Sequence, residues 1–246
     1  MKAFKFIVVV LTAITLCTNF SSCNNDEPAK GDNGLVLNEK RLVKIVNEWD
    51  ERLYEYDNQG RLIKDKDGDY LWTDDAIKYF SDNFSEYFYL ENSLITNTKY
   101  KTFTYNQSNR LSKIIYKDDC TINFLWDNDK LISINEEYDN NYVNDNDIDI
   151  TITYDKICKK GYFPIFYYLY FGDHFGYCED FFIAQPEILG VRTKQLPAIV
   201  HGGRYNEHTR TLAYEFDKEG YISKIIINRV DYDGESYTST YILTWK

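Results

Sequence analysis

One pattern of apolar and polar positions recurs along the chain: an aromatic residue, a short turn of Asp, Asn or Gly, and a stretch in which apolar and polar residues alternate. It is clearest at residues 56–64, Tyr-Asp-Asn-Gln-Gly-Arg-Leu-Ile-Lys, and it returns at 105–114 and 216–225. Shorter versions lie at 126–134 and 38–45. Alternation with a period of two on either side of such a turn is typical of a β-hairpin. The pattern therefore predicts a degenerate series of hairpins.

The turn residues fit this interpretation. Gly60 and Gly220 can adopt a positive φ without steric cost, and Asn109 is the next best residue for that conformation. Asp67-Gly68 and Asp233-Gly234 predict two further tight turns, the second of which leads into the last strand. In that strand, residues 237, 239, 241, 243 and 245 share one face, and the residues between them share the other.

The composition favours the same fold class. Aromatic residues make up 17% of the 246 positions, against Gly 12 and Pro 4, and aromatic side chains favour extended backbone. We expect an all-β domain of roughly ten to fourteen antiparallel strands. This meander of hairpins would form a curved sheet or a barrel-like domain, and the lysines that follow the turns would keep one face in water.

Residues 159–203 interrupt the hairpins and predict a cap insertion. Its first half is strongly aromatic, and residues 179–189 have the character of a short helix that ends at Gly190. One interpretation is that the aromatic residues plug the curved sheet as part of its core. The other is a partly open platform for a neutral glycan or another protein, formed by Tyr162, Phe166, Tyr167, Tyr168 and Tyr170.

The first 22 residues are typical of an export signal. Lys2 and Lys5 precede an apolar stretch at 6–16, which is shorter than the roughly 20 residues of a membrane-spanning helix. Small residues before Cys23 resemble the lipobox of bacterial lipoproteins, in which this cysteine is acylated and becomes the first residue of the mature chain. The sequence thus predicts a lipoprotein signal peptide at 1–22 and attachment to a membrane through lipid on Cys23.

The charge limits the partners. Removing residues 1–22 leaves 26 basic and 39 acidic residues, a formal charge of −13. Such a charge disfavours nucleic acids, acidic polysaccharides and electrostatic attraction to anionic lipid. Residues 23–36 are polar and acidic and predict a flexible tether, which leaves 37–246 as a single β-repeat domain with the insertion at 159–203.

The hairpin units resemble the Tyr-Asp repeats of large bacterial surface proteins. They are more similar to a family of Bacteroidetes lipoproteins of unknown function with a porin-like fold, as is the element Leu189-Gly190-Val191-Arg192-Thr193-Lys194-Gln195-Leu196-Pro197. The resemblance implies an outer-membrane lipoprotein that faces the periplasm or the cell surface, and it implies no activity. An integral outer-membrane barrel is the alternative, which the lysines after the turns and the lipobox disfavour.

The residues that could carry chemistry are few. Of the five cysteines, at 17, 23, 120, 158 and 178, Cys158 and Cys178 bracket the aromatic segment and could form a disulfide; the alternative is three unpaired thiols. Cys178 with His174 or His201 as base would make a hydrolase. No spacing fits a zinc or calcium site, so we expect neither a metal nor a cofactor. The sequence favours a non-catalytic binding or scaffold protein, with a neutral-glycan-binding surface lipoprotein of a polysaccharide-uptake system as the alternative.

Overall fold

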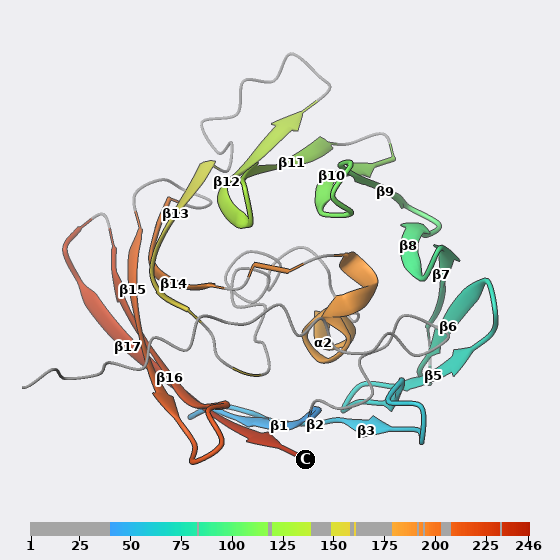
Figure 1. Cartoon of the computed structure of the whole chain (residues 1–246), viewed down its shortest axis with the longest axis horizontal. Helices are drawn as coiled ribbons and strands as arrows, with labels where there is room; N and C mark the ends of the chain where they lie inside the picture. Colours follow the sequence, from blue (N-terminus) through green and yellow to red (C-terminus); the bar gives the residue numbers. More distant parts are fainter. Residues whose placement is uncertain are drawn as a thin grey trace, which may run out of the picture.

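The computed structural model confirms the all-β fold class (Figure 1). It describes residues 40–82, 84–117, 120–138, 149–157, 160, 179–190, 192–193, 195–202, 208–231 and 233–246. The first half of the chain contains the strands Leu42–Val46 (β1), Glu51–Leu53 (β2), Glu55–Tyr56 (β3), Leu62–Lys64 (β4), Asp69–Trp72 (β5), Ala76–Phe80 (β6), Ser85–Glu91 (β7), Leu94–Asn97 (β8), Lys101–Tyr105 (β9), Leu111–Tyr116 (β10) and Cys120–Asp127 (β11). The second half contains Lys130–Tyr138 (β12), Asp149–Ile157 (β13), the helix Glu179–Ala184 (α2), the 3₁₀ turn Pro186–Leu189 (η2), Gln195–Gly202 (β14), Thr209–Phe216 (β15), Ile222–Val230 (β16) and Ser236–Trp245 (β17).

All seventeen strands belong to one antiparallel sheet that closes into a barrel-like ring. Each strand pairs with the next in sequence except β2 and β3, which continue one another with only the buried residue Tyr54 between them. The ring closes where β1 pairs with β17, with Leu42 opposite Trp245 and Val46 opposite Ile242. The described strands outnumber the ten to fourteen expected, because several turns between them lack the Gly or Asn that marks a turn in the sequence.

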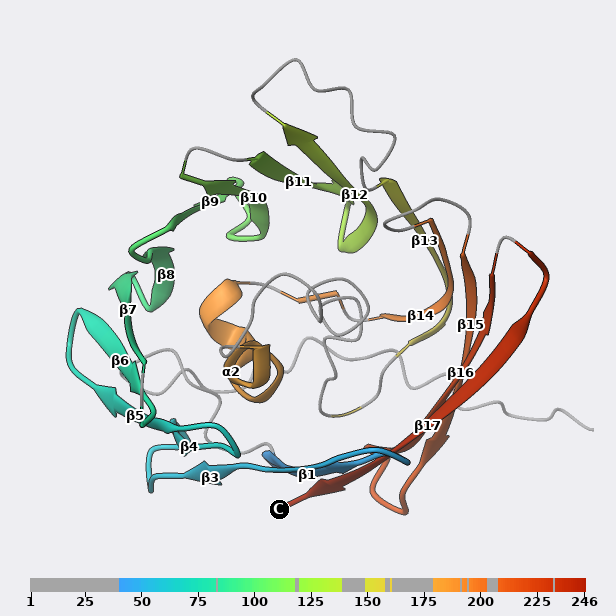
Figure 2. The same cartoon turned by 180° about the vertical axis from the view of Figure 1, so that it is seen from behind.

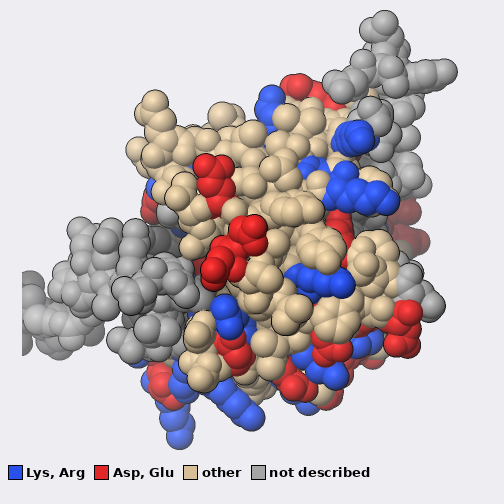
Figure 3. Space-filling model, turned by 90° about the vertical axis from the view of Figure 1, so that its right-hand side faces the viewer, with Lys and Arg blue, Asp and Glu red and all other residues tan. Residues whose placement is uncertain are grey.

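The faces of the sheet follow the predicted alternation. In β17, Tyr241, Leu243 and Trp245 are buried, whereas Ile242 and Thr244 between them are exposed. Because the ring is closed, the buried face of each strand points into its interior. The outer face carries lysine, arginine, aspartate and glutamate side chains interspersed with uncharged ones, as the side around β6–β8 shows (Figure 3).

The predicted turns adopt the conformations that their residues favour. Gly60 has φ 75°, Gly220 has φ 92° and Asn109 has φ 55°. At the first position of the turn, a side-chain oxygen accepts two backbone N–H groups: Asp57 Oδ1 from Gln59 and Arg61, at 2.9 Å each. Asn106 and Asp217 make the equivalent pairs of bonds. The repeated sequence is therefore a repeated Asx turn.

An aromatic hydrogen bond, which we call a clamp, recurs beside these turns. A tryptophan or tyrosine on one strand donates its N–H or O–H to the backbone carbonyl of an apolar residue on an earlier strand. Among the described residues, seven clamps join Tyr56 to Leu42 (2.7 Å), Trp72 to Leu62 (2.7 Å), Tyr105 to Ile95 (2.7 Å), Trp126 to Leu111 (2.7 Å), Tyr154 to Leu131 (2.7 Å), Tyr214 to Pro197 (2.6 Å) and Trp245 to Ile222 (2.7 Å).

The clamps satisfy carbonyl groups at places where the register of the sheet shifts. Shifts lie at Leu125/Trp126, Thr153/Tyr154 and Glu215/Phe216, among others. A bulge of this kind removes a backbone group from the strand ladder, and an unpaired buried carbonyl is costly. The aromatic donor supplies the missing partner.

All clamps lie at the same end of the ring, which we call the clamp end. Neighbouring strands are antiparallel and follow the order of the chain, so every second connection lies at one end. Turns 57–60, 106–109 and 217–220 are at the clamp end, and turns 47–50, 65–68 and 231–235 are at the opposite end. Lys40, where the described chain begins, is also at the clamp end, since its N–H lies 3.2 Å from the Tyr221 hydroxyl.

We predict that Trp126→Phe lowers the free energy of unfolding by about 1–3 kcal/mol, because the buried Leu111 carbonyl loses its donor. Urea denaturation followed by circular dichroism measures this change. Trp49→Phe is the matched control, since its ring is exposed, and a shift within about 0.5 kcal/mol is expected for it. Equal stabilities of the two variants would contradict the structural role of the clamps.

The Asx turns also predict an acid dependence of stability. Desolvation opposes ionisation of Asp57 and Asp217, but the N–H donors around each carboxylate outweigh it, so the pKa of both groups lies below the ordinary value. A depressed pKa in the folded state contributes stability above the ordinary pKa near 3.9 that is lost as the pH falls below it. We expect urea midpoints to fall between about pH 4 and pH 2.

The double variant Asp57→Asn, Asp217→Asn separates the charge from the turn. Asn106 shows that an amide oxygen holds the same turn, so the variant should stay folded at pH 7. Its urea midpoint should fall less with acid than that of the unmodified chain. An identical decline in both proteins would show that the turn carboxylates do not contribute.

Candidate functional site

The interior of the ring contains α2 and η2, which lie at its centre in two opposite views (Figures 1 and 2). This segment is the helical part of the predicted insertion, and residues 179–189 form it as expected. Phe181 stacks on Tyr70 of β5 with ring centroids 4.8 Å apart, and it contacts Phe88 of β7 at 5.1 Å. Phe182 reaches Phe103 of β9. The segment from α2 to η2, which we call the plug, is therefore a core element.

Polar side chains fix the backbone of the plug to the sheet. The Gln185 side chain is fully buried, and its Oε1 accepts the N–H of Leu62 at 2.8 Å. The hydroxyl of Tyr56 lies 3.2 Å from the Ala184 carbonyl, and that of Tyr105 lies 3.3 Å from the Ile188 carbonyl. The hydroxyl groups of two clamp residues, Tyr56 and Tyr105, therefore contact the plug as well as the strands.

An ion pair connects the plug to the first strand. Arg41 donates from its guanidinium to Glu187 of η2, and its charge also lies over the ring of Tyr56, 6.0 Å from the centroid. Both partners are largely shielded from water, with side-chain exposures of 13% and 20%. Because this end of the ring is occupied by the plug and its polar contacts, we do not place a ligand site there.

A second buried polar group lies on the opposite side of the interior. The Cys120 thiol of β11 donates to Oε1 of Glu136 on β12 at 3.2 Å, and Glu136 is only 4% exposed. Its Oε2 has no hydrogen-bond partner among the described residues. A carboxylate acceptor disfavours the thiolate, so this geometry does not prepare Cys120 to act as a nucleophile.

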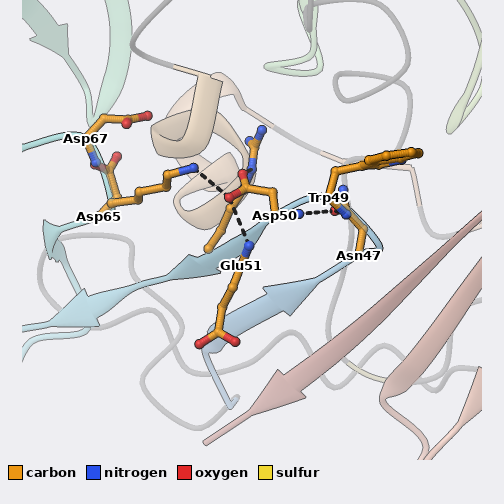
Figure 4. A network of polar contacts seen from close by, with 8 residues as sticks. Asn47, Trp49, Asp50, Glu51, Asp65 and Asp67 are labelled. Carbon is orange, nitrogen blue, oxygen red and sulfur yellow. Dashed lines mark hydrogen bonds and ion pairs between the residues drawn. The ribbon is translucent and has the colours of Figure 1, made fainter.

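The turn between β1 and β2, at the opposite end, is held by a polar network (Figure 4). Asn47 Oδ1 accepts the N–H of Trp49 at 2.8 Å and that of Asp50 at 2.6 Å. The Asp50 carboxylate accepts Lys66 Nζ at 2.6 Å and Arg52 Nε at 3.3 Å. The Lys66 hydrogen bond and the Arg52 charge hold the pKa of Asp50 below its ordinary value. Hydrogen bonds to Asn47 within the turn, and contacts of Asp50 with Arg52 on β2 and with Lys66 on the next hairpin, therefore fix the turn.

Trp49 in this turn differs from the other three tryptophans of the chain. Trp72, Trp126 and Trp245 are clamps, whereas the Trp49 side chain is 85% exposed. In Figure 4 the indole projects from the turn away from the β1 and β2 ribbons. An indole buries a large area when it packs, so a tryptophan left in water is unusual. We take this rim, Trp49 with Glu48, Asp50, Arg52 and Lys66, as the candidate site.

A further ionic group lies at the same end. Asp231 pairs with Arg229 of β16, and His208 Nδ1 lies 2.8 Å from Asp231 Oδ1. Desolvation and the neighbouring Arg229 charge lower the pKa of His208 despite the carboxylate. The imidazole is therefore mostly neutral at pH 7, and the group contributes to turn structure more than to net charge.

Most residues singled out in the sequence lie outside the described residues. These are Cys23, the platform residues Tyr162, Phe166, Tyr167, Tyr168 and Tyr170, the cysteines Cys158 and Cys178, and His174. His201 is described; it is exposed on β14 and its Nδ1 lies 2.9 Å from the Thr209 hydroxyl. The platform, disulfide and hydrolase hypotheses therefore stay predictions. Within the described ranges, no group of three or more His, Cys, Asp or Glu side chains could hold a metal ion.

The sequence analysis did not identify Trp49. A local signal exists, because Asn47 followed two residues later by an aromatic residue and then by Asp50 is consistent with an Asx turn. The sequence does not show that the other three tryptophans donate hydrogen bonds to strand carbonyls, so it does not distinguish Trp49 from them.

Gly190, which ends the plug, provides a test of how tightly the plug is seated. It has φ 93°, and an added Cβ would lie 2.1 Å from the Asn109 carbonyl oxygen. We predict that Gly190→Ala lowers the free energy of unfolding by more than about 3 kcal/mol, since backbone strain and a backbone clash add. Gly234 has φ 84° with nothing within 4 Å of its Cβ position, so Gly234→Ala should cost only about 1–2 kcal/mol. Equal losses of unfolding free energy in the two variants, measured by urea denaturation, would contradict close packing of the plug against the sheet.

Among the residues that the structure describes, no helix is long and apolar enough to cross a membrane. No protein-family model matches the chain, and no curated protein matches it either.

Solved structures share the fold, among them two porin-like proteins. A porin-like protein from Bacteroides uniformis superposes with a TM-score of 0.64 at 18% identity, covering 85% of this chain and 97% of that chain. A porin-like protein from Bacteroides vulgatus gives a TM-score of 0.60 at 12% identity, covering 85% and 99%. The expected similarity to a porin-like β fold is thus confirmed at the level of the fold.

Proposed function

We propose that the protein is a lipid-anchored envelope protein that binds a ligand or organises a complex without catalysing a reaction. The observation that carries this proposal is the N-terminal sequence: two lysines, an apolar stretch and small residues before Cys23, followed by a polar tether. The porin-like structures from two Bacteroides species support a place in the outer membrane, with the domain on its periplasmic or outer side.

The dimensions of the sheet support attachment by lipid instead of by strands. The strands β2–β5 contain two to four residues, fewer than the roughly 9–11 of a strand that spans a bilayer, whereas β12, β13, β16 and β17 contain nine or ten. The plug lies in the ring interior, and charged residues are interspersed on the side of the outer face around β6–β8 (Figure 3). Two or more acyl chains on Cys23 would anchor a domain of this kind stably.

The path of the chain supports an orientation. The tether joins the domain at Lys40, at the clamp end, where Arg41 and Lys246 exchange backbone hydrogen bonds. The opposite end, with Trp49, is therefore on the far side of the domain from the point of attachment. The buried thiol of Cys120 donates to the Glu136 carboxylate, an arrangement that does not favour its use as a nucleophile.

Replacing Cys23 by Ala tests the anchor. The variant should move from the membrane fraction to the soluble fraction and lose labelling by an alkyne palmitate analogue, because the acylated thiol is absent. Cys17→Ala is the matched control, since that cysteine lies inside the signal segment, and it should behave like the unmodified protein. Retention of the Cys23→Ala variant in washed membranes would refute the proposal.

A further inference from the structure

We infer that Trp49 and the polar side chains around it form a binding site for neutral carbohydrate. The site gives the proposed envelope protein a ligand class, and it rests on that proposed function for its biological setting. Its chemistry is argued from the rim alone.

The first step is that the fold does not use the Trp49 side chain. Trp72, Trp126 and Trp245 each donate the indole N–H to a strand carbonyl at 2.7 Å. The Trp49 indole makes no such contact with a described residue, and its side chain is 85% exposed. The ring contributes little buried area to the fold, and its faces are accessible to another molecule.

The second step is that hydrogen bonds and ion pairs fix the turn that carries the Trp49 indole. Asn47 accepts two backbone N–H groups of the turn, and the Asn47 N–H donates to the Asp50 carbonyl at 2.9 Å. The Asp50 carboxylate is tied to β2 through Arg52 and to the neighbouring hairpin through Lys66. Binding of a ligand to the indole therefore requires little further ordering of the backbone, which favours affinity.

The third step concerns the neighbours of the ring. Glu48 precedes Trp49 in the chain and is exposed, Asp50 and Arg52 are half-buried, and Lys66 on the next hairpin is exposed. Asp50 pairs with Arg52 and Lys66, so carboxylate and cationic groups both lie close to the turn that carries the indole. They offer hydrogen-bond acceptors and donors at the edge of one flat apolar surface, which is the combination that a sugar ring requires, with its apolar C–H face and its hydroxyl rim.

Other ligand classes fit less well. The core of a protein interface is depleted in charged residues, whereas charges surround this single ring. An anionic lipid surface or a nucleic acid would meet Glu48, Asp50 and Glu51 within two residues of the indole. The formal charge of −11 for the whole chain also repels acidic polysaccharides, which leaves neutral sugars.

The test uses the full-length chain in detergent and four neutral probes: maltohexaose, cellohexaose, xylohexaose and mannohexaose. Isothermal titration should detect binding of at least one of them, and the tryptophan fluorescence should change on binding. Trp49→Ala should weaken binding about tenfold or more with an unchanged melting temperature. Trp49→Phe should keep part of the affinity but lose most of the fluorescence change, since the other three tryptophans are clamps.

Tyr100→Ala is the matched control, because Tyr100 is also an exposed aromatic residue in a turn at the same end, 49% accessible. Its affinity should equal that of the unmodified chain. The inference is overturned if none of the four hexaoses binds, or if binding is insensitive to Trp49→Ala. It is also overturned if Trp49 is required for binding to phosphatidylethanolamine–phosphatidylglycerol vesicles and not for sugars. None of these results depends on Cys23, so failure here leaves the anchor proposal standing.

Discussion

The hydrogen bond from an aromatic side chain to a displaced backbone carbonyl is the interaction on which this sheet depends. A closed ring of short strands needs sharp turns and bulges, and each bulge removes a backbone group from the ladder. Here Trp or Tyr supplies the missing donor at one end of the ring, as Trp245 does for Ile222 at 2.7 Å. The same side chain fills the interior, so one residue both satisfies the backbone and packs the core. Seven of the described Tyr and Trp side chains have this double role.

The plug extends this arrangement to the interior. Tyr56 and Tyr105 each approach one strand carbonyl and one plug carbonyl, so the ring and its contents share donors. Gln185 then uses its amide oxygen for the backbone of β4. Shared donors couple the two parts energetically, since removal of either one leaves polar groups of the other unsatisfied. The clamp end is consequently the end at which the ring and the plug are joined, and the exposed Trp49 lies in a turn at the opposite end.

The features that could be predicted from the sequence are the local ones. The Asx turn at Asp57, the positive φ of Gly60 and the helix before Gly190 follow from residues close together in the chain. The extra strands were missed because the turn after Thr73 is closed by a threonine hydroxyl on Ala76, without glycine. Closure of the ring depends on Leu42 meeting Trp245, a long-range register that no local pattern encodes. Trp49 was missed for a related reason. Its exposure is informative only by comparison with the other three tryptophans, whose clamp hydrogen bonds also depend on the register of the sheet.

The pairing of β1 with β17 has a consequence for the time course of biogenesis. The first and last strands complete each other, and contacts such as Lys40 with Tyr221 join residues 181 positions apart. Such a topology has high contact order, and the entropy of closing so long a loop must be met before the final ladder forms. A chain that lacks β17 leaves β1 and β16 with open edges. Closure of the ring therefore waits until β17 is available to pair with β1.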